Sequence, residues 1–72
     1  MSNKEFEKAR KALGVKLLNA REKLRLTQQE VADAANVHVN YYARMERGQV
    51  NPSFEKLQSV MRVLKIISLD LF

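Results

Sequence analysis

The chain has 72 residues, no cysteine, and 13 lysines and arginines against 8 aspartates and glutamates, for a net charge of +5. A chain this short forms one domain, residues 1–72, with a small core, because it buries only roughly 60% of the surface that its unfolded form exposes. Without cysteine, neither a disulfide nor a thiolate metal site reinforces the fold, and the cytoplasm is the expected compartment. No apolar run is long enough to span a bilayer, and the charged N-terminus is unlike a signal sequence.

The positive charge is concentrated in the first third of the chain. Residues 1–25 hold eight basic residues against three glutamates, whereas residues 26–72 hold five basic and five acidic residues. Such a field favours nucleic acid or an anionic membrane surface, although a lysine-rich helix is often only a solvated face. Membrane binding is the weaker interpretation, since the apolar face of this segment is needed for the small core.

The first predicted element is a long amphipathic helix over residues 3–24. Its apolar residues recur every three or four positions, as one buried face of a helix requires. They are Phe6, Ala9, Leu13, Leu17, Ala20 and Leu24. Gly14 weakens this helix without breaking it. Phe6 and Ala9 in the first turns of this helix, or Leu18, could form a surface that binds a partner protein, or they could add packing within the domain.

Two short helices follow, joined by a tight turn. Thr27 and Glu30 have the spacing of a capping box, which predicts a helix start at Thr27. Asn36 tolerates the left-handed conformation that ends a helix, so the turn falls at residues 36–37. The next helix covers residues 39–47 and is closed by Gly48.

The last third of the chain predicts two more helices. Ser53 is the expected N-cap of the fourth. Its expected buried residues are Phe54, Leu57, Val60, Met61 and Leu64. Residues 66–72 read as a short fifth helix capped by Ser68, too apolar to be left exposed. Strand alternation is nowhere convincing, so the expected class is all-α with five helices.

The helix over residues 39–47 has two distinct edges. At 100° per residue, Tyr42 and Met45 point one way while Asn40, Arg44 and Arg47 cluster on the opposite side. Asparagine pairs with adenine and arginine with guanine in the major groove, and Val39 could touch a thymine methyl. The simplest interpretation of these polar residues is an ordinary solvent-exposed face. Their position favours DNA binding instead, because the second helix after a tight turn is the element that enters the groove in helix-turn-helix proteins.

Several segments of the chain together resemble the phage repressor and Cro family of helix-turn-helix domains, also called the Xre family. The resemblance covers about residues 12–72. The segments are Leu13-Gly14 through Arg21, Thr27-Gln28-Gln29-Glu30-Val31-Ala32, Asn36-Val37, Met45-Glu46-Arg47-Gly48, Asn51-Pro52-Ser53 and Ser68-Leu69-Asp70-Leu71-Phe72. At two turns the chain departs from the family, which commonly has glycine where Arg25 and Asn36 stand. His38 likewise replaces the usual serine or threonine cap.

This resemblance implies a compact five-helix, lambda-repressor-like domain whose third helix reads double-stranded DNA, usually as a homodimer on a palindromic operator. Residues 1–11 would be a helical extension. The implied base contacts are Val39, Asn40 and Arg44, and the implied backbone contacts are Gln28, Tyr41 and Arg47. It also implies a structural ion pair between Arg21 and Glu46. A dimer interface is expected in the tail at Leu69, Leu71 and Phe72.

The remaining candidates have simpler interpretations. His38 has no second ligand at metal-binding spacing, so a helix cap or phosphate contact is expected. Tyr41 and Tyr42 diverge by 100° on a helix and cannot form one stacking surface; Tyr42 is expected in the core and Tyr41 partly exposed. No catalytic set, cofactor motif or phosphate loop is present, so we expect no enzyme and no cofactor.

The sequence therefore predicts a cytoplasmic, nucleoid-associated transcription regulator, most often a repressor in this family, that reads an operator. A phage repressor, a restriction-modification controller and an antitoxin all remain possible contexts. The alternative function is a protein-interaction module, an antitoxin or anti-repressor that neutralises a partner. Its signature would be an exposed apolar patch on the first helix or the tail, without a continuous basic surface facing the groove.

Overall fold

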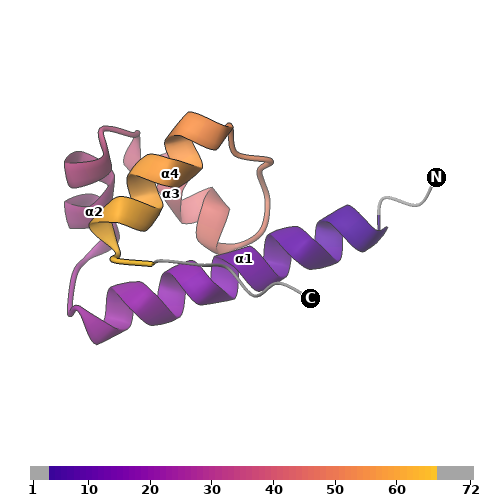
Figure 1. Ribbon diagram of the computed structural model, residues 1–72, viewed down its shortest axis with the longest axis horizontal. Helices are drawn as coiled ribbons and strands as arrows, with labels where there is room; N and C mark the ends of the chain where they lie inside the picture. Colours follow the sequence, from indigo (N-terminus) through magenta and orange to yellow (C-terminus); the bar gives the residue numbers. More distant parts are fainter. Residues whose placement is uncertain (1–3, 67–72) are drawn as a thin grey trace.

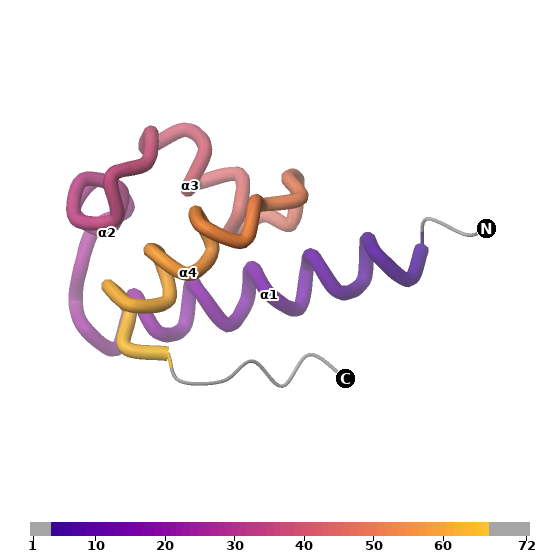
Figure 2. The backbone as a smooth tube through the Cα atoms, turned by 45° about the horizontal axis from the view of Figure 1, so that its top comes forward, coloured from indigo at the N-terminus to yellow at the C-terminus, as the bar shows by residue number. Residues whose placement is uncertain are grey.

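The computed structural model describes residues 4–66, and this part of the chain forms four helices and no strand. They are α1 (Lys4–Lys23), α2 (Gln28–Ala35), α3 (Val39–Glu46) and α4 (Phe54–Val63). In Figures 1 and 2, α2, α3 and α4 gather on one side of α1, whose first turns extend beyond them. The all-helical prediction is confirmed for these residues, and none of their helices is long and apolar enough to cross a membrane.

The predicted fifth helix falls almost entirely outside the described residues. Ile66, its first residue, is described and is not helical. Ser68, its expected cap, and the expected dimer contacts Leu69, Leu71 and Phe72 lie outside the part of the chain that the structure describes.

Helices α2, α3 and α4 each begin with a side chain that accepts a backbone N–H of the first turn. Thr27 Oγ1 accepts from the Glu30 N–H at 3.0 Å, and Glu30 Oε1 accepts from the Thr27 N–H at 2.8 Å, so the predicted capping box is confirmed. Ser53 Oγ caps α4 by accepting the N–H three residues later at 3.3 Å. His38 Nδ1 caps α3 by accepting the N–H two residues later at 3.1 Å. These local bonds fix where the three helices start.

All four helices end in the same way, at a residue in the left-handed region. These residues are Arg25, Asn36, Gly48 and Lys65, with φ between 58° and 71°. In each case the left-handed residue donates to the carbonyl three residues earlier, and the next residue donates to the carbonyl five residues earlier, at 2.9 to 3.2 Å. This pair of bonds is the Schellman motif. Gly48 closes its helix as predicted, whereas Arg25 and Lys65 adopt a conformation that is costly for a residue with a Cβ.

The core lies where the three short helices meet the middle of α1. Its members are buried side chains from every helix and from the residue after α4. They are Leu13, Leu17, Val31, Ala32, Ala35, Tyr42, Met45, Val60 and Leu64. Ala20 and Leu24, from the predicted apolar face of α1, pack against this cluster while remaining partly accessible. Burial of these residues holds the four helices together, with α3 packed against α1 and with α2 packed against both α3 and α4.

Both glycines of the chain lie where α1 crosses the end of α3. A Cβ placed on Gly14 would collide with the carbonyl oxygen of Glu46 and would lie 2.8 Å from the carbonyl oxygen of Met45. A Cβ on Gly48 would lie 2.9 Å from Cα of Lys11. The backbones of α1 and α3 therefore approach closely at these two points. This contact positions α3 relative to the rest of the domain.

Phe54 was expected in the core, and this prediction is wrong: its side chain is 76% exposed. Phe54 is the first residue of α4, six residues before the fully buried Val60. At 100° per residue, its side chain lies about 120° around the helix axis from that of Val60. Phe6 is similarly at the outer end of α1 and is 53% exposed. Both phenylalanines lie at helix starts, beyond the region where the helices pack together.

Candidate nucleic-acid interface

The connection between α2 and α3 is a tight turn of three residues, 36–38. Asn36 has φ 58° and ψ 44°, which ends α2, and His38 has the extended backbone and side-chain bond of an N-cap, which starts α3. The chain changes direction between the two helices within these three residues (Figure 2). In this geometry the first helix packs against the second and supports it, while one face of the second helix remains exposed at the surface of the domain.

One edge of α3 is buried and the opposite edge faces outward. Tyr42 and Met45 are 0% and 1% exposed, while Asn40 and Arg44 are exposed. Asn40 and Arg44 are four residues apart, so they are neighbours on the same helix face. Val39, the first residue of α3, is half-buried and packs against the core. Of the three residues predicted to read bases, Asn40 and Arg44 therefore share the exposed surface, and their side chains have the donor and acceptor groups that base edges require.

Three predicted backbone contacts surround this surface. His38 is exposed, and because Nδ1 accepts the capping bond, its Nε2 carries the proton and is free to donate outward. Arg47 is exposed, and its Nε donates to Oε1 of Gln49 at 3.0 Å. Tyr41 is half-buried, and the Lys56 ammonium lies 4.4 Å from its ring centroid. These contacts orient Arg47 and Tyr41 before any ligand binds.

Gln49 and Lys56 are neighbours of the candidate interface that the sequence interpretation missed. Gln49 follows the end of α3, and Lys56 lies in the first turn of α4. The Gln49 contact could have been anticipated from its position two residues after Arg47. The Lys56 contact joins α4 to α3 and depends on tertiary packing, so no local signal in the sequence marks it.

The ion pair that the resemblance implied is present behind the exposed edge. Arg21 of α1 donates from Nε to Oε2 of Glu46 at 2.6 Å and from Nη2 to Oε1 at 3.2 Å. Their side chains are 16% and 5% exposed. Arg21 Nη1 also donates to the Leu26 carbonyl oxygen at 3.0 Å, and Gln28 Nε2 donates to Glu46 Oε1 at 2.9 Å. Glu46 therefore joins α3 to both α1 and α2.

Pairing, and not burial, determines the ionisation of Glu46 and Arg21. Burial raises the pKa of Glu46, but the hydrogen bonds and charge of Arg21, together with Tyr42 and Gln28, outweigh it, so the pKa lies below its usual value of 4.5. The hydrogen bond to Glu46 raises the pKa of Arg21 despite burial. Both partners are therefore charged at neutral pH, and this largely buried ion pair holds the end of α3 against α1.

The Tyr42 hydroxyl lies inside the same region. Burial first, and then the Glu46 carboxylate, raise its pKa above the usual value of 10.0. Although the Glu46 carboxylate affects the pKa of this hydroxyl, the hydroxyl makes no hydrogen bond within residues 4–66. Tyr42 thus contributes mainly through the packing of its ring, as expected for a core residue.

The position of Gln28 bears on its predicted phosphate contact. Its side chain is half-buried at the first position of α2, and one N–H of its amide is committed to Glu46. An amide nitrogen carries two hydrogens, so a second donor and the free backbone N–H groups at this helix start remain for an anion. The hydrogen bond to Glu46 holds the Gln28 amide in place at the edge of α3.

Comparison with known proteins agrees with this geometry. The model of a helix-turn-helix family matches residues 17–72, which is most of the chain and includes α2, the turn and α3. Searches of curated proteins and of solved structures found no match. The family match covers the two helices and the turn whose arrangement is described above, so the chain belongs to the Xre/Cro-like helix-turn-helix family of DNA-binding domains.

Proposed function

We propose that this protein is a sequence-specific regulator of transcription that reads an operator by placing α3 in the major groove of double-stranded DNA. The observation that carries the proposal is the outward edge of α3, on which Asn40 and Arg44 are exposed next to each other while the opposite edge is fully buried. Asn40 pairs with adenine and Arg44 with guanine, and Val39 touches a thymine methyl. Each bidentate pair contributes roughly 1–3 kcal/mol of discrimination.

The flanking residues supply contacts to the DNA backbone. Gln28 and His38 offer donors at the starts of α2 and α3, where the positive end of each helix dipole favours a phosphate. Tyr41 lies between Asn40 and Arg44 in the sequence of α3, and Arg47 is the residue that follows the helix. Because such contacts are made to any sequence, they fix the register of α3 while the base contacts select the operator.

We further propose that the protein binds as a homodimer to a palindromic operator and acts as a repressor. Helix-turn-helix dimers place their two reading helices one turn of DNA apart, about 34 to 36 Å. Two-fold symmetry in the protein then predicts two inverted half-sites with centres about 10 base pairs apart. A DNA-competent dimer with a very different spacing would contradict this part of the proposal.

Selection of bound sequences from a random duplex library, with competition at several salt concentrations, tests the proposal. Recovery of an inverted repeat supports a dimeric operator-binding regulator. Binding that depends on salt but not on sequence, or no binding at all, would refute it. That outcome would favour the protein-interaction alternative, for which the exposed Phe6 and Phe54 are the first residues to examine.

A further inference from the structure

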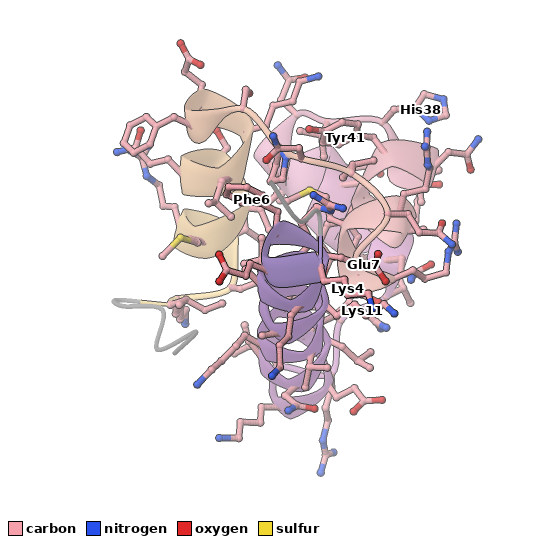
Figure 3. The ribbon with its side chains drawn as sticks, turned by 90° about the vertical axis from the view of Figure 1, so that its right-hand side faces the viewer. Lys4, Phe6, Glu7, Lys11, His38 and Tyr41 are labelled. Atoms are coloured by element: carbon pink, nitrogen blue, oxygen red, sulfur yellow. The ribbon has the colours of Figure 1, made fainter. Side chains whose placement is uncertain are left out.

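The first three turns of α1 precede residues 17–72, the segment matched by the family model. In these turns Lys4, Glu7 and Lys11 are spaced by three and four, so they share one face of the helix. Figure 3 looks along α1 from its N-terminal end, and these three side chains lie on the side of α1 where His38 also lies. Phe6 lies on the other side, toward α4, where it lines a groove with Leu57.

Lys11 packs directly against the end of α3. The backbone of Lys11 is so near Gly48 that a Cβ on the glycine would lie 2.9 Å from Cα of Lys11 and 2.8 Å from its Cγ. Gly48 follows Arg47, one of the predicted backbone contacts. The Lys11 side chain is nevertheless 65% exposed, so its ammonium emerges into solvent beside the C-terminal end of the reading helix.

We propose that this face of α1, formed by Lys4, Glu7 and Lys11, is an additional contact to the DNA backbone, in which Lys11 binds a phosphate flanking the bases read by α3. The inference rests on the proposed function, because it assumes that α3 occupies the major groove. Phosphates line both walls of that groove, and a lysine whose backbone is held beside the end of the helix can reach one of them with its exposed ammonium. The turns of α1 ahead of the matched segment thereby lengthen the DNA footprint.

Glu7 controls this contact. In the free protein its Oε1 lies 3.3 Å from Nζ of Lys11, and the two side chains are 52% and 65% exposed. An exposed pair of this kind is weak, so a phosphate can replace the carboxylate as the partner of Lys11. The carboxylate also repels an approaching phosphate. Removal of Glu7 and removal of Lys11 therefore change DNA affinity in opposite directions.

The test measures Kd by fluorescence anisotropy for the operator recovered by selection and for an unrelated duplex, across a range of salt concentrations. Lys11→Gln is compared with Lys16→Gln, which removes an exposed lysine from the same helix, about 140° around its axis. Glu7→Gln is compared with Glu5→Gln, which removes an exposed carboxylate from the same turn but another face. Thermal melts verify that all four variants fold.

For Lys11→Gln we expect the slope of log K against log salt to become shallower by about 0.9, the value for one lost phosphate contact. The affinity loss should be equal on the two duplexes, because a phosphate contact carries no sequence information. Glu7→Gln should bind both duplexes more tightly than the wild-type protein. The variants Lys16→Gln and Glu5→Gln should change the slope and the affinities less than their counterparts.

Two results would overturn the inference while leaving the proposed function intact. One is a wild-type slope in Lys11→Gln, and the other is an equal change in Lys16→Gln, which would show a response to net charge alone. If the wild-type protein binds neither duplex, the proposed function itself fails, and the inference fails with it.

Discussion

Replacement of Gly14 by alanine should destabilise the protein, although intrinsic helix propensity predicts the opposite. Gly14 lies in the interior of α1, where alanine is normally about 1 kcal/mol more favourable than glycine. The structure reverses this expectation because α3 crosses α1 at this residue. The sign of the effect therefore separates a local account of α1 from one based on its packing.

The cost follows from the atoms that the new methyl group would meet. It would lie 2.7 Å from the carbonyl carbon of Glu46 and 2.8 Å from the carbonyl oxygen of Met45, and it would overlap the Glu46 oxygen. All are backbone atoms that cannot rotate away, so α1 and α3 must separate. Overpacking of this kind costs about 3 kcal/mol at the upper end of its usual range. After the gain in propensity, we expect a net loss of about 2 kcal/mol, which lowers Tm by roughly 8 to 16 °C.

Urea denaturation followed by circular dichroism measures this effect. Asn19→Ala is the matched control, because Asn19 is exposed on the same helix and alanine there gains about 0.6 kcal/mol of propensity. Gly14→Ala should shift the midpoint to lower urea and Asn19→Ala to equal or higher urea. If Gly14→Ala stabilised the protein as much as Asn19→Ala does, the close approach of α1 and α3 would be refuted.

Three further variants test other parts of the structure. Arg25→Gly should stabilise the protein by up to about 1 kcal/mol in urea denaturation, because glycine adopts the left-handed φ of 58° without strain; a loss of stability would contradict this account. Glu46→Gln should cost about 2 kcal/mol at pH 7. Folding lowers the pKa of Glu46, so its contribution to stability is present above pH 4.5 and is lost as the pH falls through the folded-state pKa. Urea denaturation at pH 7 and pH 3 should therefore show a smaller difference in unfolding free energy between wild type and Glu46→Gln at pH 3. An equal difference at the two pH values would refute this linkage. Gln28→Ala should weaken binding to operator and random duplex by equal factors in anisotropy titrations, and a loss confined to the operator would contradict a backbone contact.

Features governed by near neighbours in the chain were predictable from the sequence. The capping box at Thr27, the cap at Ser53 and the left-handed turn at Asn36 each depend on residues within a few positions. The two edges of α3 likewise follow from helical periodicity, which placed Tyr42 in the core. The family resemblance supplied the pairing of Arg21 with a residue of α3, which no local pattern contains.

Features that depend on how the helices pack were not predictable in the same way. Phe54 matched the apolar spacing of α4, yet it lies beyond the end of the core and is exposed. Gly14 looked like a weak point in α1, whereas the structure gives it a role at the crossing with α3. Arg25 and Lys65 end their helices in the left-handed region without the glycine that usually signals it. The approach of Lys56 to Tyr41 required the position of α4.

The central claim, that the exposed edge of α3 reads bases, is tested most directly by repeating the random-duplex selection with Arg44→Ala. If Arg44 pairs with a guanine, the variant should recover the wild-type motif with discrimination lost at one base pair in each half-site, by roughly 1 to 3 kcal/mol, and preserved at the others. An unchanged motif, or an equal loss of affinity for operator and random DNA, would contradict base reading by this residue and with it the proposed role of α3.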